Sequence, residues 1–506
     1  MKGRLKDVMT QADGDNRVSD TVRSLADRTK DGVKRRLSID RRALAVFRIG
    51  LGVIVLVDII TRSSNFVAFY TNEGVLPTSY LSADPLSSVS LHFVSGDVWF
   101  QALLFVVMGI FAFLLVVGYR TRLATLASFV LVVSLQEYNP YVLNAGDLLL
   151  RWYLFFGIFL PLGARWSVDS LHGTGKSDGH SVENIAAASA LLYALMIYTV
   201  NGTSKLTSDA WTSGEAVANV LNTEKYTVLL GNHIGGFTEL LVFFNWSWLA
   251  LLLASAFLIL LTWWLRFFLS GAFIAAHTGM FLTMQLAVFP VVAIAVLTLF
   301  MPPVFWNRVE SLTQRFVMSD GRARRVSSLL WLDIEPLTPR RIRRGVSVFA
   351  HIFVGVVLLT SLMWQVDYAG YGEVPEEVEN VADPIRESWT LFAPNPPSSD
   401  DWFLAPATLE SGEKVDLLHL NDEELDRPPD AGGSYPTARW RKYLTHSTFE
   451  NSEDRIDRLA VFLCERGARQ YESDPVNVTV YDVWQPEPVE DPDRIYEDEL
   501  VSYDCS

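Results

Sequence analysis

Residues 193–214 read YALMIYTVNGTSKLTSDAWTSG, an apolar run that ends in a lysine where the chain is predicted to leave a membrane. That lysine, Lys205, is unusual because arginine carries nearly all the other positive charge between Lys34 and Lys414. An amine is the basic side chain most easily made neutral by burial, so Lys205 is a candidate proton acceptor. The alternative is a lysine that extends from the helix end to the lipid headgroups. The sequence leaves both interpretations open.

The composition separates a membrane part from an acidic tail. Half of the 506 residues are apolar, and they gather in long runs. From residue 371 to the end the chain carries 32 acidic and 11 basic side chains, a net charge of −21, which leaves +6 on the first 370 residues. Such acidity with scarce lysine is typical of a halophilic protein, and it argues against a nucleic-acid partner for the tail.

We therefore predict a membrane all-α bundle of about nine transmembrane helices, followed by a C-terminal soluble α+β or β-rich acidic ectodomain. The predicted transmembrane helices cover residues 43–60, 98–117, 123–135, 148–162, 185–200, 237–261, 268–289, 291–305 and 346–364. Helices one to eight fall within residues 43–306, and the ectodomain is predicted over residues 371–506.

Basic segments indicate the orientation of the chain. Residues 1–42 carry twelve basic and seven acidic side chains and form a predicted cytoplasmic arm. Residues 307–345 carry nine arginines against four acids and form a predicted cytoplasmic loop before the ninth helix, residues 346–364. This places the N-terminus in the cytoplasm and the acidic domain outside, in a multi-pass protein of the cell membrane.

Several polar side chains fall within or beside the predicted helices. Arg48 and Asp58 either reach the two membrane surfaces or face a polar interior. Arg151 follows Asp147 by four residues on one helix, a spacing that predicts an ion pair. His277 lies near the middle of the membrane, either as a hydrogen-bonded packing residue or as part of a site.

The acidic tail contains patterns of regular structure. Residues 408–415 alternate around Ser411 and Gly412, as in a β-hairpin. After it, residues 455–471 predict a helix and residues 476–484 a strand. The two cysteines, Cys464 and Cys505, have no metal-binding spacing, and the sequence alone neither requires nor excludes a disulfide between them.

Short motifs occur in order over most of residues 40–420. They are FRIG at 47–50, YTNEGVLP at 70–77, NAGD at 144–147, PLG and WSVD between 161 and 169, GTSKL at 202–206 with Trp211 and Gly214, His277 followed by FPVV and PPVFW, and WTLFAP at 389–394. Together these motifs resemble the horizontally transferred transmembrane (HTTM) family, whose best-studied relative is the vitamin K-dependent γ-glutamyl carboxylase.

The resemblance implies a specific role for one residue. In the carboxylase, the lysine of the Gly-x-x-Lys-Leu element is the base that deprotonates a reduced naphthoquinone such as menaquinol, and Lys205 matches it. Oxygen then converts the quinol to a strong base that removes a proton from the γ-carbon of a glutamate, to which carbon dioxide adds. The carboxylase also uses a histidine directly after an asparagine, whereas Asn144 is followed here by Ala145.

These features are compatible with three classes of function. The first is a quinol-dependent carboxylase or oxygenase that acts on a protein or peptide at the outer face, and the second is a non-catalytic membrane scaffold that binds lipid or a partner. A transporter is disfavoured because the sequence shows no internal repeat. For the enzyme, the candidate catalytic residues are Lys205, His277 and Asn144, and the candidate substrate- or cofactor-binding residues are Asp147, Asp209, Trp211 and Arg151. No metal site is predicted.

Overall fold

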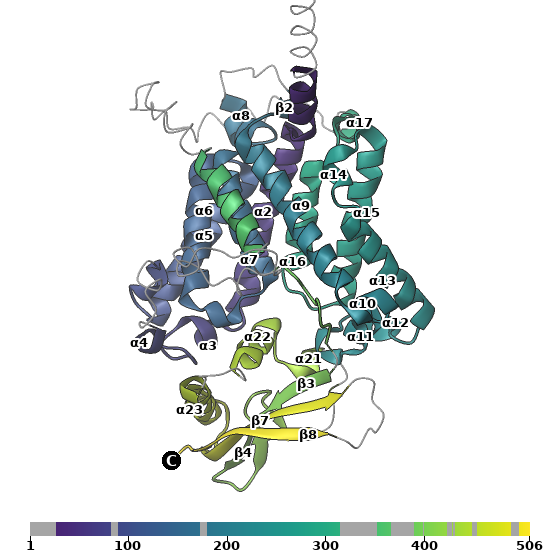
Figure 1. Ribbon diagram of the computed structural model, residues 1–506. Coiled ribbons are helices and arrows are strands. Elements are labelled where there is room, and N and C mark those ends of the chain that lie inside the picture. Colours follow the sequence, from purple (N-terminus) through teal and green to yellow (C-terminus); the bar gives the residue numbers. More distant parts are fainter. Residues whose placement is uncertain are drawn as a thin grey trace, which may run out of the picture.

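The structure is a computed structural model that describes residues 27–81, 90–172, 180–313, 352–365, 389–397, 399–422, 428, 431–447, 453–486 and 495–506. A bundle of helices packs against a smaller C-terminal domain built on a β-sheet (Figure 1). Much of the predicted arm, residues 1–26, and of the predicted cytoplasmic loop, residues 314–345, lies outside the described residues.

Long helices make up the bundle. They are α2 (Arg41–Ser63), α5 (Val98–Val117), α6 (Thr121–Tyr138), α7 (Ala145–Phe159), α9 (Ile185–Leu206), α13 (Thr238–Leu253), α15 (Trp263–Thr283), α16 (Phe289–Leu297), α17 (Pro303–Thr313) and the helix Ile352–Gln365. Short elements connect them, namely α3 (Phe66–Tyr70), α4 (Thr78–Leu81), α8 (Val168–His172), α10 (Asp209–Ser213), α11 (Ala216–Asn222), α12 (Gly231–Ile234), α14 (Phe257–Leu260) and the two-stranded pair β1 (Ile39–Asp40) and β2 (Ser181–Val182).

Four helices of the described chain are long and apolar enough to cross a membrane: α2, α5, α9 and α15. The bent pair Phe289–Phe300 and Pro303–Leu312, which turns by 100°, makes a fifth if it is one crossing. α13 and the helix Ile352–Gln365 are apolar but shorter. The protein is therefore a largely helical membrane protein, and the count of nine crossings stays a prediction.

Several predicted helices differ from the observed ones. The eighth, residues 291–305, is broken because α16 ends at Leu297 and α17 begins at Pro303, after a turn of 100°. The sixth, residues 237–261, is divided because α13 ends at Leu253 and α14 begins at Phe257. The seventh, residues 268–289, ends at Thr283, where a bridge between Thr227 and Met284 draws the chain out of the helix. An apolar run has no signal for such a contact, because both partners lie far apart in the sequence.

Two glycines allow the first helices of the bundle to pack closely. A Cβ on Gly52 would lie 2.8 Å from the carbonyl oxygen of Ala112, so α2 and α5 approach through a position without a side chain. Gly118 ends α5 in the left-handed conformation, with a φ of 71°.

Arg48 is buried beside this turn and donates a hydrogen bond to the carbonyl of Trp166 at 2.6 Å. It faces the protein interior.

A buried ion cluster joins the bundle to the C-terminal domain. Arg62 of α2 donates to Asp58 at 2.7 Å and to the carboxylate of Asp147 at the start of α7. Arg439 of the C-terminal domain donates to Asp58 at 2.8 Å and also contacts Asp147. All four side chains are at most 6% exposed. The cluster is electrically balanced, as burial of charges requires.

The predicted ion pair between Asp147 and Arg151 is wrong. Asp147 is taken up by Arg62 and Arg439, and Arg151 instead pairs with Glu137 at 3.0 Å and donates to Gln136 at 2.7 Å. Helix spacing permits the pair, but a carboxylate at the start of α7 is reached by arginines from two other elements. Neither arginine is near Asp147 in sequence.

The C-terminal domain is a mixed helix and sheet structure. Its strands are β3 (Ser399–Leu404), β4 (Pro406–Leu409), β5 (Lys414–Asp416), β6 (Asn421–Asp422), β7 (Pro475–Pro486) and β8 (Tyr496–Asp504), and its helices are α21 (Ala431–Ser434), α22 (Ala438–Ser447) and α23 (Glu453–Gln470). Strand β7 is central and antiparallel to β8 on one edge, and to β3 and β4 on the other.

The tail patterns are confirmed. β4 and β5 form the predicted hairpin, with Thr408 opposite Lys414 and Gly412 at a φ of 83°. α23 and β7 are the predicted helix and strand. A disulfide joins Cys464 of α23 to Cys505 after β8, which fixes the helix to the end of the sheet. α22 lies on the side of the domain that faces the bundle (Figure 1).

Candidate functional site

A cavity of about 980 Å³ lies where α9, α13 and α15 meet the C-terminal domain. Residues from α10, from the turn after α11 and from α22 complete its wall. Its polar side chains include Asn144, Tyr198, Asn201, Lys205, Lys225, Tyr226, His277, Arg441 and Lys442. The cavity therefore belongs jointly to the bundle and to the C-terminal domain.

The last turn of α9 supplies two of these side chains. Asn184 caps the start of the helix by accepting a hydrogen bond from the backbone N–H of Ala187, and the helix then runs the length of the bundle. Asn201 and Lys205 are four residues apart, so they lie on one face. Lys205 is 1% exposed and Asn201 is 3% exposed. The interpretation that Lys205 extends to the lipid headgroups is wrong, because its side chain points into the protein.

A short segment that we call the strap, residues 389–393, crosses this face of α9. Asn201 Nδ2 donates to the carbonyls of Trp389, Thr390 and Leu391. Lys205 Nζ donates to the carbonyl of Leu391 at 2.7 Å. Leu391 and Phe392 have φ values of 38° and 60°, a left-handed conformation that non-glycine residues adopt at a cost. Contacts from α9 hold the strap in this conformation.

Trp211 covers the amine from the other side. The indole ring lies 4.0 Å from Lys205 Nζ, and its Nε1 donates to the carbonyl of Phe392 at 2.8 Å. Asn245 of α13 holds α10 in place through a 2.9 Å hydrogen bond to the Trp211 carbonyl. Lys205 is thus enclosed between an aromatic face and a backbone carbonyl.

His277 of α15 faces the same cavity. Its Nδ1 lies 2.8 Å from the carbonyl of Phe273, so Nδ1 carries the hydrogen and donates. Its Nε2 is buried and has no hydrogen-bond partner among the described residues. Hydrogen bonding to its own helix is the packing role, and the lone pair on Nε2 is the group that remains for a ligand.

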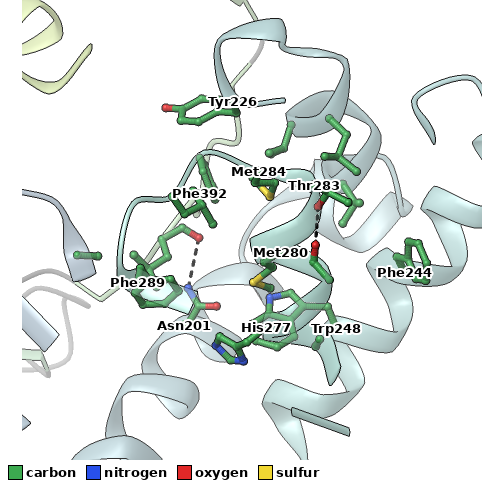
Figure 2. A pocket seen from close by; sticks show the side chains of 18 of the residues that line it. Asn201, Tyr226, Phe244, Trp248, His277, Met280, Thr283, Met284, Phe289 and Phe392 are labelled. Carbon is green, nitrogen blue, oxygen red and sulfur yellow. Dashed lines mark hydrogen bonds between the residues drawn. The ribbon is translucent and has the colours of Figure 1, made fainter. Parts of the chain in front are cut away.

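Apolar and aromatic side chains form the rest of the wall. Figure 2 shows Trp248, His277 and Met280 close together at one end, with Tyr226 and Phe392 at the other. The rings of Tyr226 and Phe392 lie 5.2 Å apart, and those of Trp248 and His277 lie 5.5 Å apart. Such a cavity suits a ligand with a flat ring or a long apolar part.

The structure brings together four of the seven candidate site residues. Lys205, His277, Asn144 and Trp211 all line the cavity. Asn144 also caps α7, because its Oδ1 accepts from the backbone N–H of Gly146. The other three, Asp147, Arg151 and Asp209, are not among the lining residues. Asp147 and Arg151 are held in the ion pairs described above, and Asp209 is exposed on α10.

Four polar groups of the site were not among the residues expected from the sequence. Asn201 precedes Lys205 by one helical turn, a spacing that could have marked it. Lys225 is one of only three lysines between Lys34 and Lys414. Arg441 and Lys442 belong to the run RWRK at 439–442, a basic cluster within an acidic tail. A basic run in an otherwise acidic tail is therefore the sequence feature that could have identified Arg441 and Lys442.

Comparison with known proteins decides the family. The HTTM domain profile matches residues 37–306, more than half of the chain. This protein belongs to the HTTM family. No curated protein and no solved structure matches it.

The boundary of the HTTM domain divides the cavity. Lys205, Trp211, His277, Asn144 and Lys225 lie inside the matched residues 37–306, and the strap, Arg441 and Lys442 lie after them. The HTTM domain therefore supplies the apolar walls and the enclosed lysine, and the C-terminal part closes the cavity with backbone carbonyls and two cations.

Proposed function

We propose that this HTTM protein is a quinol-dependent membrane enzyme, a carboxylase or oxygenase, in which Lys205 is the base. The observation that carries the proposal is the setting of this amine, which is buried against Trp211 in a largely apolar cavity that His277 and Asn144 also line. Among the described residues, no carboxylate forms an ion pair with it, and its contacts are a carbonyl and an indole face. An ammonium group without a counter-ion is costly to bury, and an amine accepts a proton only when it is neutral.

The cavity fits a reduced naphthoquinone. A flat bicyclic ring with an apolar tail matches a wall in which Trp248, Phe289 and Met280 lie around the buried His277 (Figure 2). Such a quinol supplies, with oxygen, a base strong enough to remove a proton from a carbon acid. The part of this chain is to exclude water, to accept a hydroxyl proton at Lys205 Nζ, and to accept a hydrogen bond at His277 Nε2.

Turnover by the purified chain tests the proposal. We expect the protein in neutral detergent to convert a reduced menaquinone analogue to its epoxide or quinone in the presence of oxygen. Lys205→Ala should lower the rate by at least about 100-fold, the usual contribution of a positioned acid or base. Lys414 is an exposed lysine of β5, so Lys414→Ala is the matched control and should keep the full rate. A Lys205→Ala protein that folds and turns over normally would remove the lysine from the mechanism.

The alternative is a non-catalytic scaffold that binds lipid or a partner protein. It is favoured by Ala145, which lines the cavity where the carboxylase has a histidine. In that case quinol turnover is absent in the wild-type chain. The C-terminal domain fused to an unrelated membrane anchor would then restore the phenotype lost on deletion of the gene, whereas an enzyme requires the complete cavity.

A further inference from the structure

The charged side chains that line the cavity are all basic. Besides Lys205, three basic side chains line it, Lys225, Arg441 and Lys442, and no carboxylate is present among the described lining residues. The whole chain has a net charge of −15. A wall with only positive side chains in so acidic a protein is not a consequence of composition. It indicates a ligand that brings negative charge.

Arg441 of α22 is the best-defined of these cations. Its guanidinium lies 4.4 Å from the centre of the Tyr226 ring and donates hydrogen bonds to the carbonyl of Lys225 and, at 2.7 Å, to the carbonyl of Gln285. These acceptors are neutral oxygens. They fix the direction of the guanidinium without neutralising its charge.

Burial disfavours the charged forms of Arg441 and of the neighbouring Lys442 and Lys225. Burial lowers the pKa of Arg441. Burial together with the charge of Arg441 lowers the pKa of Lys442, and the charge of Asp147 acts in the opposite direction. Burial lowers the pKa of Lys225 to about 8, although its amine forms an ion pair with Asp401, which lies outside the cavity lining, so Arg441 and Lys442 are the cations that remain for a ligand. An anion placed among these groups would relieve part of this cost, because opposite charge favours the protonated forms.

Another part of the wall is apolar and includes an exposed side chain of the bundle. On α15, Ala272, Ala275, Ala276 and Gly279 line the cavity with small side chains, and Phe243 of α13 lines it while 63% exposed. α15 is one of the four helices long and apolar enough to cross a membrane. A ligand held at the cationic end can therefore extend an apolar chain between α13 and α15 toward lipid.

We propose that the cavity binds an amphiphile with an anionic headgroup, which Arg441 and Lys442 hold while its apolar tail lies between α13 and α15. This goes beyond the proposed enzyme activity, since a quinol carries no fixed negative charge. The headgroup chemistry is a phosphate or a similar anion, which an arginine recognises through two parallel hydrogen bonds and a lysine as a point charge.

Native mass spectrometry of the full chain, released from a neutral detergent, tests this. The probes share one acyl chain and differ in the head: monoacyl glycerol phosphate, monoacyl glycerophosphocholine and monoacyl glycerol. We expect the phosphate lipid to bind at least about tenfold more tightly than the other two. Lys442→Gln and Arg441→Gln should each remove about tenfold of that preference, the effect of about 1.4 kcal/mol. Lys414→Gln, on the exposed face of β5, should leave it unchanged.

A substitution in the apolar wall separates a lipid from a free anion. Gly279→Leu adds a side chain where an added Cβ has no atom within 4 Å, so the helix accommodates it and the tail loses space. It should weaken all three lipids by about the same factor and leave any binding of inorganic phosphate unchanged. Since Arg441 is buried and its variant can fail to fold, Lys442→Gln and Gly279→Leu decide the question by themselves.

Three results would overturn the proposal. One is equal affinity for the three headgroups, and another is loss of the preference in Lys414→Gln as well. The third is inorganic phosphate, or a short polyglutamate peptide, binding tightly while the phosphate lipid does not. Quinol turnover is a separate readout, so an active enzyme with no headgroup preference would reject this inference and keep the proposed function.

Discussion

At the scale of single residues, the site depends on polar groups that bind backbone rather than other charges. Asn201 and Lys205 donate to carbonyls of the strap, and Trp211 Nε1 donates to the next carbonyl along. Each of these side chains is buried, so the loss of one partner leaves a polar group without a hydrogen bond, at a cost of about 1–3 kcal/mol. The strap therefore stays closed over Lys205 only while α9 and α10 keep their positions.

Asp482 gives a pH prediction at the same scale. Burial, with Asp498 directly opposite on β8, raises the pKa of Asp482 to about 6, and its Oδ1 has no hydrogen-bond partner among the described residues. Between about pH 4 and pH 6 the folded form thus binds more protons than the unfolded form. The free energy of unfolding should fall as pH rises through this range, by at most about 3 kcal/mol before solvent screening.

Thermal unfolding of the full chain at pH 4.5 to 7 checks this. Asp482→Asn should flatten the pH dependence and raise stability most at the upper end of the range, because the amide never takes a charge. Asp457→Asn, an exposed aspartate of α23, is the matched control and should leave the dependence as it is. If the pH dependence of stability in Asp482→Asn equals that of the wild type, groups other than Asp482 determine it.

At the scale of elements, α22 is the helix that connects the two parts of the molecule. It carries Arg439 to the ion cluster of Asp58, Arg62 and Asp147, and Arg441 to the cavity. Helical geometry explains how residues two apart reach different targets, since they point about 200° apart around the axis. One basic turn of α22 thus both holds the C-terminal domain against the bundle, through Arg439, and lines the cavity, through Arg441.

Replacing Arg439 should separate these two parts. Arg439→Ala leaves two buried carboxylates opposite one arginine, and removal of one partner from a buried ion network costs about 3–5 kcal/mol. We expect a lower unfolding temperature of the full chain and faster proteolysis between the bundle and the C-terminal domain. Arg458→Ala on the exposed face of α23 should change neither. A wild-type melting profile in Arg439→Ala would mean that the domain is held by other contacts.

At the scale of the whole molecule, Lys205 and the acidic domain lie at one end of the bundle. The strap and α22 contact that end directly, whereas α8 and α17 lie at the other (Figure 1). The turn between α5 and α6 lies beside α8, because the backbone N–H of Arg120 donates to Asp169 of α8 at 2.8 Å, and Arg122 follows in the first turn of α6. Which of the two ends faces the cytoplasm stays a prediction from the arginine-rich segments.

Cysteine labelling of intact cells checks the orientation. A membrane-impermeant maleimide should label Asp209→Cys beside the site and Glu413→Cys in the β4–β5 hairpin, both of which are exposed. Arg122→Cys, also exposed, should react only after the membrane is permeabilised. Labelling of Asp209→Cys and Glu413→Cys from different sides would contradict both the orientation and the shared cavity.

Local patterns in the sequence were enough for the elements that form by themselves. Apolar runs marked α2, α5 and α9, alternation around Gly412 marked the hairpin, and an amphipathic stretch marked α23. The scarcity of lysine singled out Lys205, a position near the middle of the membrane singled out His277, and the family resemblance added Asn144, all of which line one cavity. These signals are local because they come from burial and backbone periodicity within one segment.

Only the tertiary structure decided which charges meet. Asp147 pairs with Arg62 and Arg439 instead of Arg151, and the cavity takes Arg441 and Lys442 from a helix more than 200 residues after Lys205. The choice depends on distances between elements far apart in the chain, which neither spacing nor composition contains. Burial then enforces the outcome, because a charge removed from water has to find a partner wherever the fold places one.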